Sequence, residues 1–176
     1  MKLGKIVMLA VLGILAVTPA MAEPTRITVR VLSKDAKFVG TSVGGVLIQI
    51  RDAQSGALLA EGVTAGDTGD TKRIMLADRK RGVPLATEEA AKFEATLNIE
   101  EPRWVEVTAY GPLAQRQSAN RTSATQWVVP GKHITGGDAW LLELPGLVVD
   151  VLAPPAHLKL GGLPQRVELR ANVMMM

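Results

Sequence analysis

Apolar and polar residues alternate along several short stretches of this chain. The clearest stretches are 27–31, 46–50, 93–99 and 105–109, where at least every second residue is apolar. A period of two places these apolar side chains on one face, so each stretch predicts a half-buried β-strand. Turn-forming residues separate the stretches, and Ala53-Gln54-Ser55-Gly56 in particular predicts a β-hairpin. The pattern predicts an all-β protein, and specifically an antiparallel β-sandwich.

One short helix and two long loops interrupt this pattern. Thr87 can cap a helix, Glu88 and Glu89 suit its first turn, and Ala90 to Lys92 continue it. The stretches Lys34–Gly45 and Gly111–Thr125 are predicted to be loops. Loops of this length in a compact domain are often functional. We therefore hypothesise that these two loops build a binding surface.

Residues 1–22 have the three parts of a secretory signal peptide. Lys2 and Lys5 precede an apolar run from Ile6 to Val17, and Ala20-Met21-Ala22 fits a signal peptidase site. The apolar run is shorter than the roughly 20 residues that span a bilayer. We predict cleavage after Ala22, no stable membrane span afterwards, and export to the periplasm, with the cell surface and full secretion as alternatives.

Composition and charge narrow the classes of function. The chain has 20 basic and 17 acidic residues, and loss of Lys2 and Lys5 with the signal would leave 18 against 17. A nearly neutral exported protein does not indicate binding to nucleic acid or to an anionic membrane. The sequence has no Cys, which excludes disulfides, thiolate metal sites and cysteine nucleophiles.

The chain divides near Leu144-Pro145-Gly146. We assign residues 23–145 to the sandwich and interpret 146–176, where alternation resumes, as the start of a second immunoglobulin-like β domain. Two or three strands cannot bury a core alone. They either complete the first sandwich or belong to a chain that continues. We expect the second, because an apolar strand at a terminus would leave an unprotected edge.

The hairpin region resembles a known family. The segments 46–52, 55–57, 62–64 and 66–70 resemble the transthyretin-like, carboxypeptidase-regulatory-like sandwich modules of exported bacterial proteins. The resemblance covers about residues 27–75. In the last turn, Gly precedes each Asp, which departs from the family's order. The resemblance implies a non-catalytic module that serves as a spacer, a folding aid or a binding surface.

Two aromatic residues are candidates for binding. Trp104 and Tyr110 fall on the face of a predicted strand opposite to Val105 and Val107. Exposed aromatic side chains can anchor a protein or stack on a sugar ring. The alternative interpretation is that both pack against a second domain or line the other face of the sheet. The expected partner is a protein or another component of the cell envelope.

The methionines at the end of the sequence suggest a second function. The thioethers of Met174 and Met176, with His157, could bind Cu(I) in a copper-handling protein outside the cytoplasm. On a strand, Met174 and Met176 share a face and Met175 points the other way. The alternative is that the methionines fill a core. No other cofactor is predicted.

Two further motifs are interpreted as structural. Gly40 to Gly44 matches the G-x-S-x-G elbow of serine hydrolases, but a strand rather than a helix is predicted after Ser42. Asp67 and Asp70 lack the spacing of a calcium-binding loop and suit a solvated turn. The sequence therefore predicts no enzyme. It predicts a non-catalytic, exported binding or structural module.

Overall fold

The computed structural model describes residues 22–162 and 164–176. The predicted signal peptide, apart from Ala22, lies outside these residues. Within the described ranges, no helix is both long enough and apolar enough to cross a membrane.

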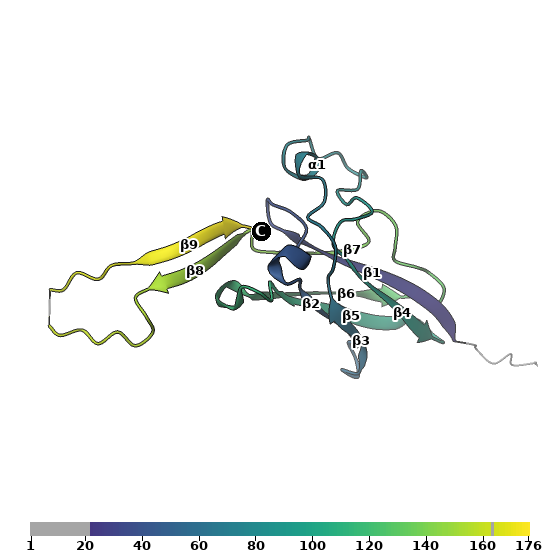
Figure 1. Ribbon diagram of the computed structural model, residues 1–176. Helices are drawn as coiled ribbons and strands as arrows, with labels where there is room; N and C mark the ends of the chain where they lie inside the picture. The colour runs from purple at the N-terminus through teal and green to yellow at the C-terminus, as the bar shows by residue number, and fades with distance from the viewer. Residues whose placement is uncertain (1–21, 163) are drawn as a thin grey trace, which may run out of the picture.

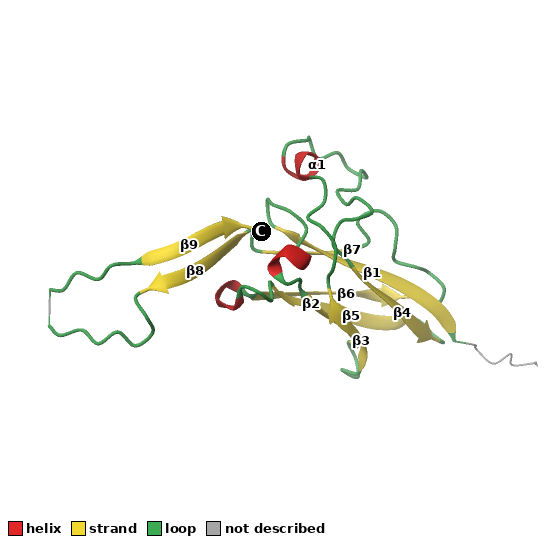
Figure 2. Cartoon of the chain, viewed as in Figure 1, coloured by secondary structure: helices red, strands yellow, loops and turns green. Residues whose placement is uncertain are grey.

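The described part of the chain is nearly all β (Figures 1 and 2). The strands are β1 Glu23–Ser33, β2 Leu47–Asp52, β3 Leu58–Val63, β4 Phe93–Ile99, β5 Arg103–Gly111, β6 Asn120–Val128, β7 Trp140–Leu144, β8 Leu147–Ala153 and β9 Arg170–Met175. The helical segments are η1 Thr41–Val43, α1 Thr71–Met75 and η2 Arg116–Ser118. The predicted all-β class is confirmed.

Strands β1 to β7 form two sheets that pack as a sandwich. One sheet has the order β4-β1-β7 and the other β3-β2-β5-β6. Neighbouring strands are antiparallel except for β1 and β7, which run parallel from Val29 opposite Trp140 to Ser33 opposite Leu144. A parallel pair needs a long connection, and here the whole chain from β2 to β6 provides it.

The alternating positions supply the core between the sheets. Ile27, Val29 and Val31 of β1 face Ile48 and Ile50 of β2 across the interior, and all five side chains are at most 1% exposed. Val105 and Val107 of β5 belong to the same cluster. The sequence prediction of these strands, and of which residues they bury, is therefore confirmed.

A second, smaller apolar cluster lies apart from this core. It consists of Leu32, Phe38, Ile74, Ala90 and Ala91. The segment between β3 and β4 supplies three of these residues, so it covers part of the surface around the end of β1.

The predicted helix from Thr87 is wrong. Ala90 and Lys92 instead make isolated β-bridges with Asp67 and Ala65, because burial of Ala90 and Ala91 holds this segment extended. The short helix α1 lies earlier and is capped by Asp70, whose carboxylate accepts the N–H groups of Lys72 and Arg73. A local capping signal at Thr87 was overridden by tertiary packing.

The predicted loop Gly111–Thr125 is also partly wrong. β5 continues to Gly111, and β6 begins at Asn120 after a short connection that contains η2. β6 is an edge strand with alternating exposed and half-buried side chains, and it carries few apolar residues. An edge strand with one solvated face tolerates such a polar sequence. Its alternation of exposed and half-buried side chains therefore does not show up as an alternation of apolar and polar residues.

The predicted hairpin forms at Ala53-Gln54-Ser55-Gly56, between β2 and β3. Asp52 Oδ1 accepts hydrogen bonds from the N–H of Gln54 (3.0 Å) and from the N–H (2.8 Å) and hydroxyl (3.0 Å) of Ser55. Arg103 pairs with Asp52 Oδ2 at 3.2 Å. The Ser55 hydrogen bonds, with smaller help from Gln54 and Arg103, hold the pKa of Asp52 below its ordinary value although desolvation opposes them.

Strands β8 and β9 pair with each other and project from the sandwich (Figure 1). We call residues 147–175 the arm. Its base is fixed in the body, since Val148 and Met176 are buried in the main core. The Met176 N–H donates to the Gly146 carbonyl, and the Met176 carbonyl accepts from the Lys37 N–H. The other end of the arm is the loop 154–169.

Candidate functional site

The outer face of the β3-β2-β5-β6 sheet carries the predicted aromatic residues. Because Val105 and Val107 point into the core, Trp104 and Tyr110 of β5 point outward. Both side chains are half-buried by their cross-strand neighbours.

Trp104 lies opposite Trp127 of β6. The two ring centroids are 5.4 Å apart, with the planes inclined at 54°, a tilted arrangement that is favourable for aromatic pairs. Trp127 is 58% exposed. Sequence reasoning missed Trp127 because the predicted loop Gly111–Thr125 covers the first part of β6 and no strand is predicted at residues 126–128, although Trp127 immediately precedes the buried Val128.

At the other end of this face, Tyr110 lies opposite Arg121. The Arg121 guanidinium carbon is 5.5 Å from the Tyr110 ring centroid, which is a cation–π contact. Between the two aromatic ends the face is polar, and Gln49 donates a 2.6 Å hydrogen bond to Glu61. The face thus has a Trp pair at one end, a Tyr–Arg pair at the other and hydrogen-bonding groups between them.

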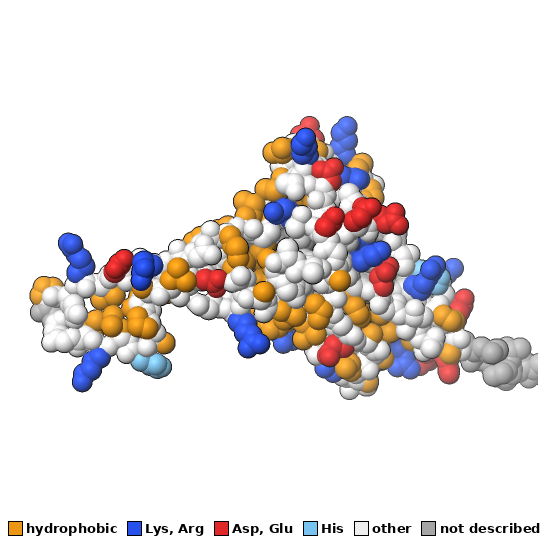
Figure 3. Space-filling view, in the orientation of Figure 1, with side chains coloured by type: hydrophobic (Ala, Val, Ile, Leu, Met, Phe, Trp, Pro, Cys, Tyr) orange, Lys and Arg blue, Asp and Glu red, His pale blue; other side chains and the backbone are white. Residues whose placement is uncertain are grey.

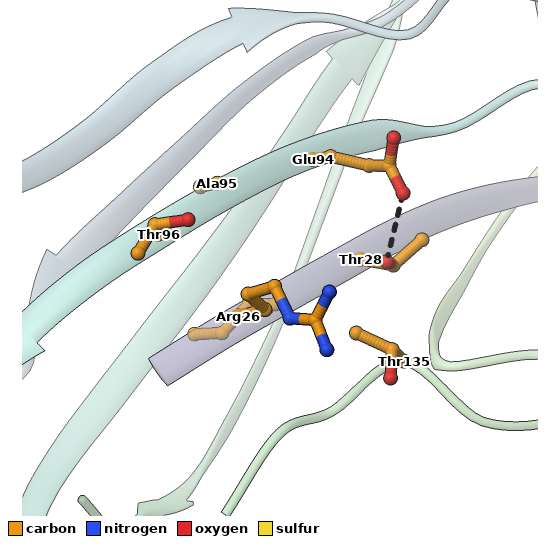
Figure 4. Close-up of a pocket in the computed structure, with 7 residues that line it drawn as sticks. Arg26, Thr28, Glu94, Ala95, Thr96 and Thr135 are labelled. Carbon is orange, nitrogen blue, oxygen red and sulfur yellow. Dashed lines mark hydrogen bonds between the residues drawn. The ribbon is translucent and has the colours of Figure 1, made fainter. Parts of the chain in front are cut away.

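The opposite sheet has a hollow of about 350 Å³ on its outer face (Figure 4). Arg26 and Thr28 of β1, Glu94 and Thr96 of β4, and Thr135 are among its lining residues. Thr28 donates a long, 3.5 Å hydrogen bond to Glu94. The hollow is open and holds one cationic and one anionic side chain, so it is a polar surface depression rather than an enclosed site.

Arg30 is the most deeply buried basic residue near this sheet, at 6% exposure. Its guanidinium donates to the carbonyl groups of Ala90 and Ala91 and lies over the Phe38 ring, 5.9 Å from the centroid. Desolvation lowers the pKa of Arg30, while Asp138 and Glu94 oppose this effect. These contacts assign Arg30 a structural role, holding the segment between β3 and β4 against β1.

The two loops predicted to form a binding surface lie together. The N–H groups of Leu113 and Ala114 donate to the carbonyls of Gly45 and Val43, at 3.0 and 3.1 Å. This contact joins Lys34–Gly45 to the connection between β5 and β6.

The same connection holds the arm. Ser118 Oγ accepts the Val149 N–H at 2.6 Å and donates to the Val149 carbonyl at 2.8 Å. Gln117 Oε1 likewise accepts a hydrogen bond from the Val151 N–H at 3.0 Å, and Gln117 Nε2 donates to the Val151 carbonyl at 3.5 Å. The side chains of Ser118 and Gln117 therefore occupy the outer edge of β8 much as a neighbouring strand would.

The predicted copper ligands are not brought together. Met176 is buried in the core and Met174 packs against it, whereas His157 lies in the loop at the other end of the arm. Met175 points away from Met174 and Met176, as expected, and is exposed. Among the residues that the structure describes, no three His, Cys, Asp or Glu side chains are placed to hold a metal ion.

The two motifs interpreted as structural lie in turns. Ser42 is exposed in η1, and the strand β2 follows it. Asp67 accepts the Gly69 N–H at 2.7 Å, and Asp70 caps α1, so each carboxylate has a local structural partner.

Comparison of the chain with protein-family models, with curated protein sequences and with solved structures gives no match.

Proposed function

We propose that this protein is a non-catalytic, exported module of the transthyretin-like type that binds a protein of the cell envelope, most simply in the periplasm. The binding surface that we propose is the outer face of the β3-β2-β5-β6 sheet. Export rests on the sequence of residues 1–22, and the binding surface rests on the arrangement of side chains described above.

Strand order supports the family assignment. In immunoglobulin domains the first two strands lie in the same sheet. Here β1 and β2 lie in opposite sheets, which favours the transthyretin-like alternative. The β2–β3 hairpin is also the segment that carries the sequence resemblance, and its Asp52 and Ser55 stabilise the turn.

The observation that carries the proposed function is the set of side chains on the outer face of the β3-β2-β5-β6 sheet. Trp, Tyr and Arg are the residues most enriched among those that dominate protein–protein binding. Trp127, Trp104, Tyr110 and Arg121 lie on one face, in two cross-strand pairs. A strand held in a sheet presents these side chains at little further cost in conformational entropy. A protein partner fits this surface better than a sugar, because the two tryptophan rings are tilted and form no flat platform.

Photo-crosslinking in the source cells tests the proposal. The full chain carries a photoreactive amino acid at position 127 or, as a control, at position 96, where Thr96 is exposed on the opposite sheet. We expect position 127 to give a discrete adduct with an exported protein, and position 96 to give none. Equal labelling at both positions, or an adduct only with cytoplasmic proteins, would contradict the proposal.

A further inference from the structure

The arm presents an apolar face that nothing in the described structure covers. The register pairs Leu147 with Met175, Val149 with Val173 and Val151 with Ala171. Directly opposite residues of an antiparallel pair share a face, so these six side chains form one strip. The five larger ones are 39–56% exposed.

The two faces of the arm differ. The face opposite to the strip carries Val148, buried in the core, Met174, packed against it, and the polar pair Asp150 and Asn172. The strip itself contains no polar residue. A two-stranded hairpin is only marginally stable in water by itself, and contiguous exposed apolar patches mark interaction sites.

We propose that the strip packs face to face against the same strip of a second copy of this chain. Sheets that pack this way align at about 30° and bury both inner faces at a spacing of about 10 Å. A twofold axis makes such a contact self-complementary, since the same residues meet from both sides. A strip without charges has nothing to repel its own copy.

The area of the arm is compatible with a dimer. The five larger side chains of the strip are about half exposed. At on the order of 100 Å² of open surface each, the strip offers on the order of 500 Å² per copy, or about 1,000 Å² for the pair, which is the lower bound for a specific interface.

Charge selects the relative direction of the two arms. Lys159 and Arg166 lie in the loop at the tip, where Glu168 is already paired with Arg170 at 3.6 Å. Figure 3 shows basic side chains around this tip. Two tips side by side would repel, so the arms run antiparallel, and each tip reaches the base of the partner's arm. A hollow of about 270 Å³ lies there, lined by Leu147, Met175, Lys34 and Asp35; its one basic and one acidic side chain leave no net charge to repel the basic tip.

Sedimentation equilibrium of the purified full chain tests this inference. We expect a dimer, and the double variant V149D/V173D should weaken association at least about tenfold, because dimerisation would bury four carboxylates. The matched control is V63D on β3, where Val63 is 45% exposed, and it should leave the dimer intact. Circular dichroism checks that each variant remains folded.

A cross-linking experiment provides a second readout that does not require a variant designed to disrupt the dimer. The chain has no Cys, so V173C introduces a single thiol, which a short bis-maleimide should link to its copy. V63C should remain unlinked. A monomeric wild-type chain, or a dimer that survives V149D/V173D, would overturn the inference.

Binding to lipid is the competing outcome. A wild-type monomer that sediments with phosphatidylglycerol vesicles, and that loses this binding in V149D/V173D, would assign the strip to a membrane surface and overturn the dimer. The inference is independent of the proposed function, because crosslinking at position 127 reports on a different face of the molecule.

Discussion

The sandwich and the arm are built from similar strands but differ in what covers them. In β1, β2 and β5, alternating apolar side chains meet a second sheet and become fully buried. In β8 and β9, the same kind of alternation produces an apolar strip that faces solvent. Alternation therefore determines that a strand has an apolar face. The position of the strand in the tertiary structure determines whether that face becomes core or contact surface.

The two hairpins also differ in what holds their connections in place. The β2–β3 turn is short and is tied by hydrogen bonds from its own residues to Asp52. The β8–β9 connection, residues 154–169, is long, and its one side-chain hydrogen bond within the described residues is from the Gly161 N–H to Gln165. The arm depends for its position on contacts at its base with other parts of the chain.

The largest expected effect is a truncation in the core. Ile48→Ala removes a side chain that is 0% exposed between the sheets and should lower the free energy of unfolding by about 2–5 kcal/mol. Val173→Ala, on the arm strip, should change it by no more than about 0.5 kcal/mol in the monomer. Urea denaturation at low protein concentration measures both. Equal losses would show that the strip is covered within the monomer.

The second-largest effect is expected at Gly146, which immediately precedes the base of the arm. A Cβ at Gly146 would lie 2.1 Å from the Lys34 carbonyl oxygen, a backbone atom that cannot rotate away. Gly146→Ala should therefore destabilise the protein by about 1–3 kcal/mol. Gly136→Ala is the matched control, because a Cβ there meets no atom within 4 Å and its φ is not positive. Thermal or urea unfolding of the two variants should separate them clearly.

A smaller effect is expected where the arm is held at the edge of β8. Ser118→Ala removes both hydrogen bonds with Val149. A net contribution of about 0.5–1.5 kcal/mol per hydrogen bond corresponds to roughly 2- to 12-fold faster exchange of the Val149 amide. Ser123→Ala on the outer face of β6 should leave this amide unchanged. Hydrogen exchange followed by NMR measures the rate, and an unchanged rate in Ser118→Ala would show that the Ser118 hydrogen bonds do not hold the arm.

The smallest effect is a pH dependence in the short hairpin. The pKa of Asp52 is lower in the folded protein than its usual value of about 4. Its contribution to stability is therefore present above pH 4 and is lost as pH falls through the folded-state pKa. Asp52→Asn should flatten the decline of stability as pH falls below about 4. Parallel acid unfolding curves for wild type and variant would contradict this, and Asp150→Asn, on the arm, serves as the control.

The candidate binding face was only half predictable from sequence. Trp104 and Tyr110 could be assigned to an outward face because they alternate with valines. Their partners Trp127 and Arg121 could not, because β6 is a polar edge strand whose pattern resembles a loop. Pairing of β6 with β5 is a long-range hydrogen-bonding event that no local pattern encodes.

The sequence by itself determined the β class, the positions of most strands, which face of these strands is apolar, and the tight β2–β3 turn. These features follow from local physics, namely the two-residue period of a strand and the hydrogen bonds of short polar side chains. The tertiary structure alone decided that β1 pairs parallel with β7, that residues 87–92 are extended rather than helical, and that two loops meet to hold the arm. These outcomes depend on contacts between residues far apart in the chain, where burial and hydrogen-bond pairing outweigh local preference.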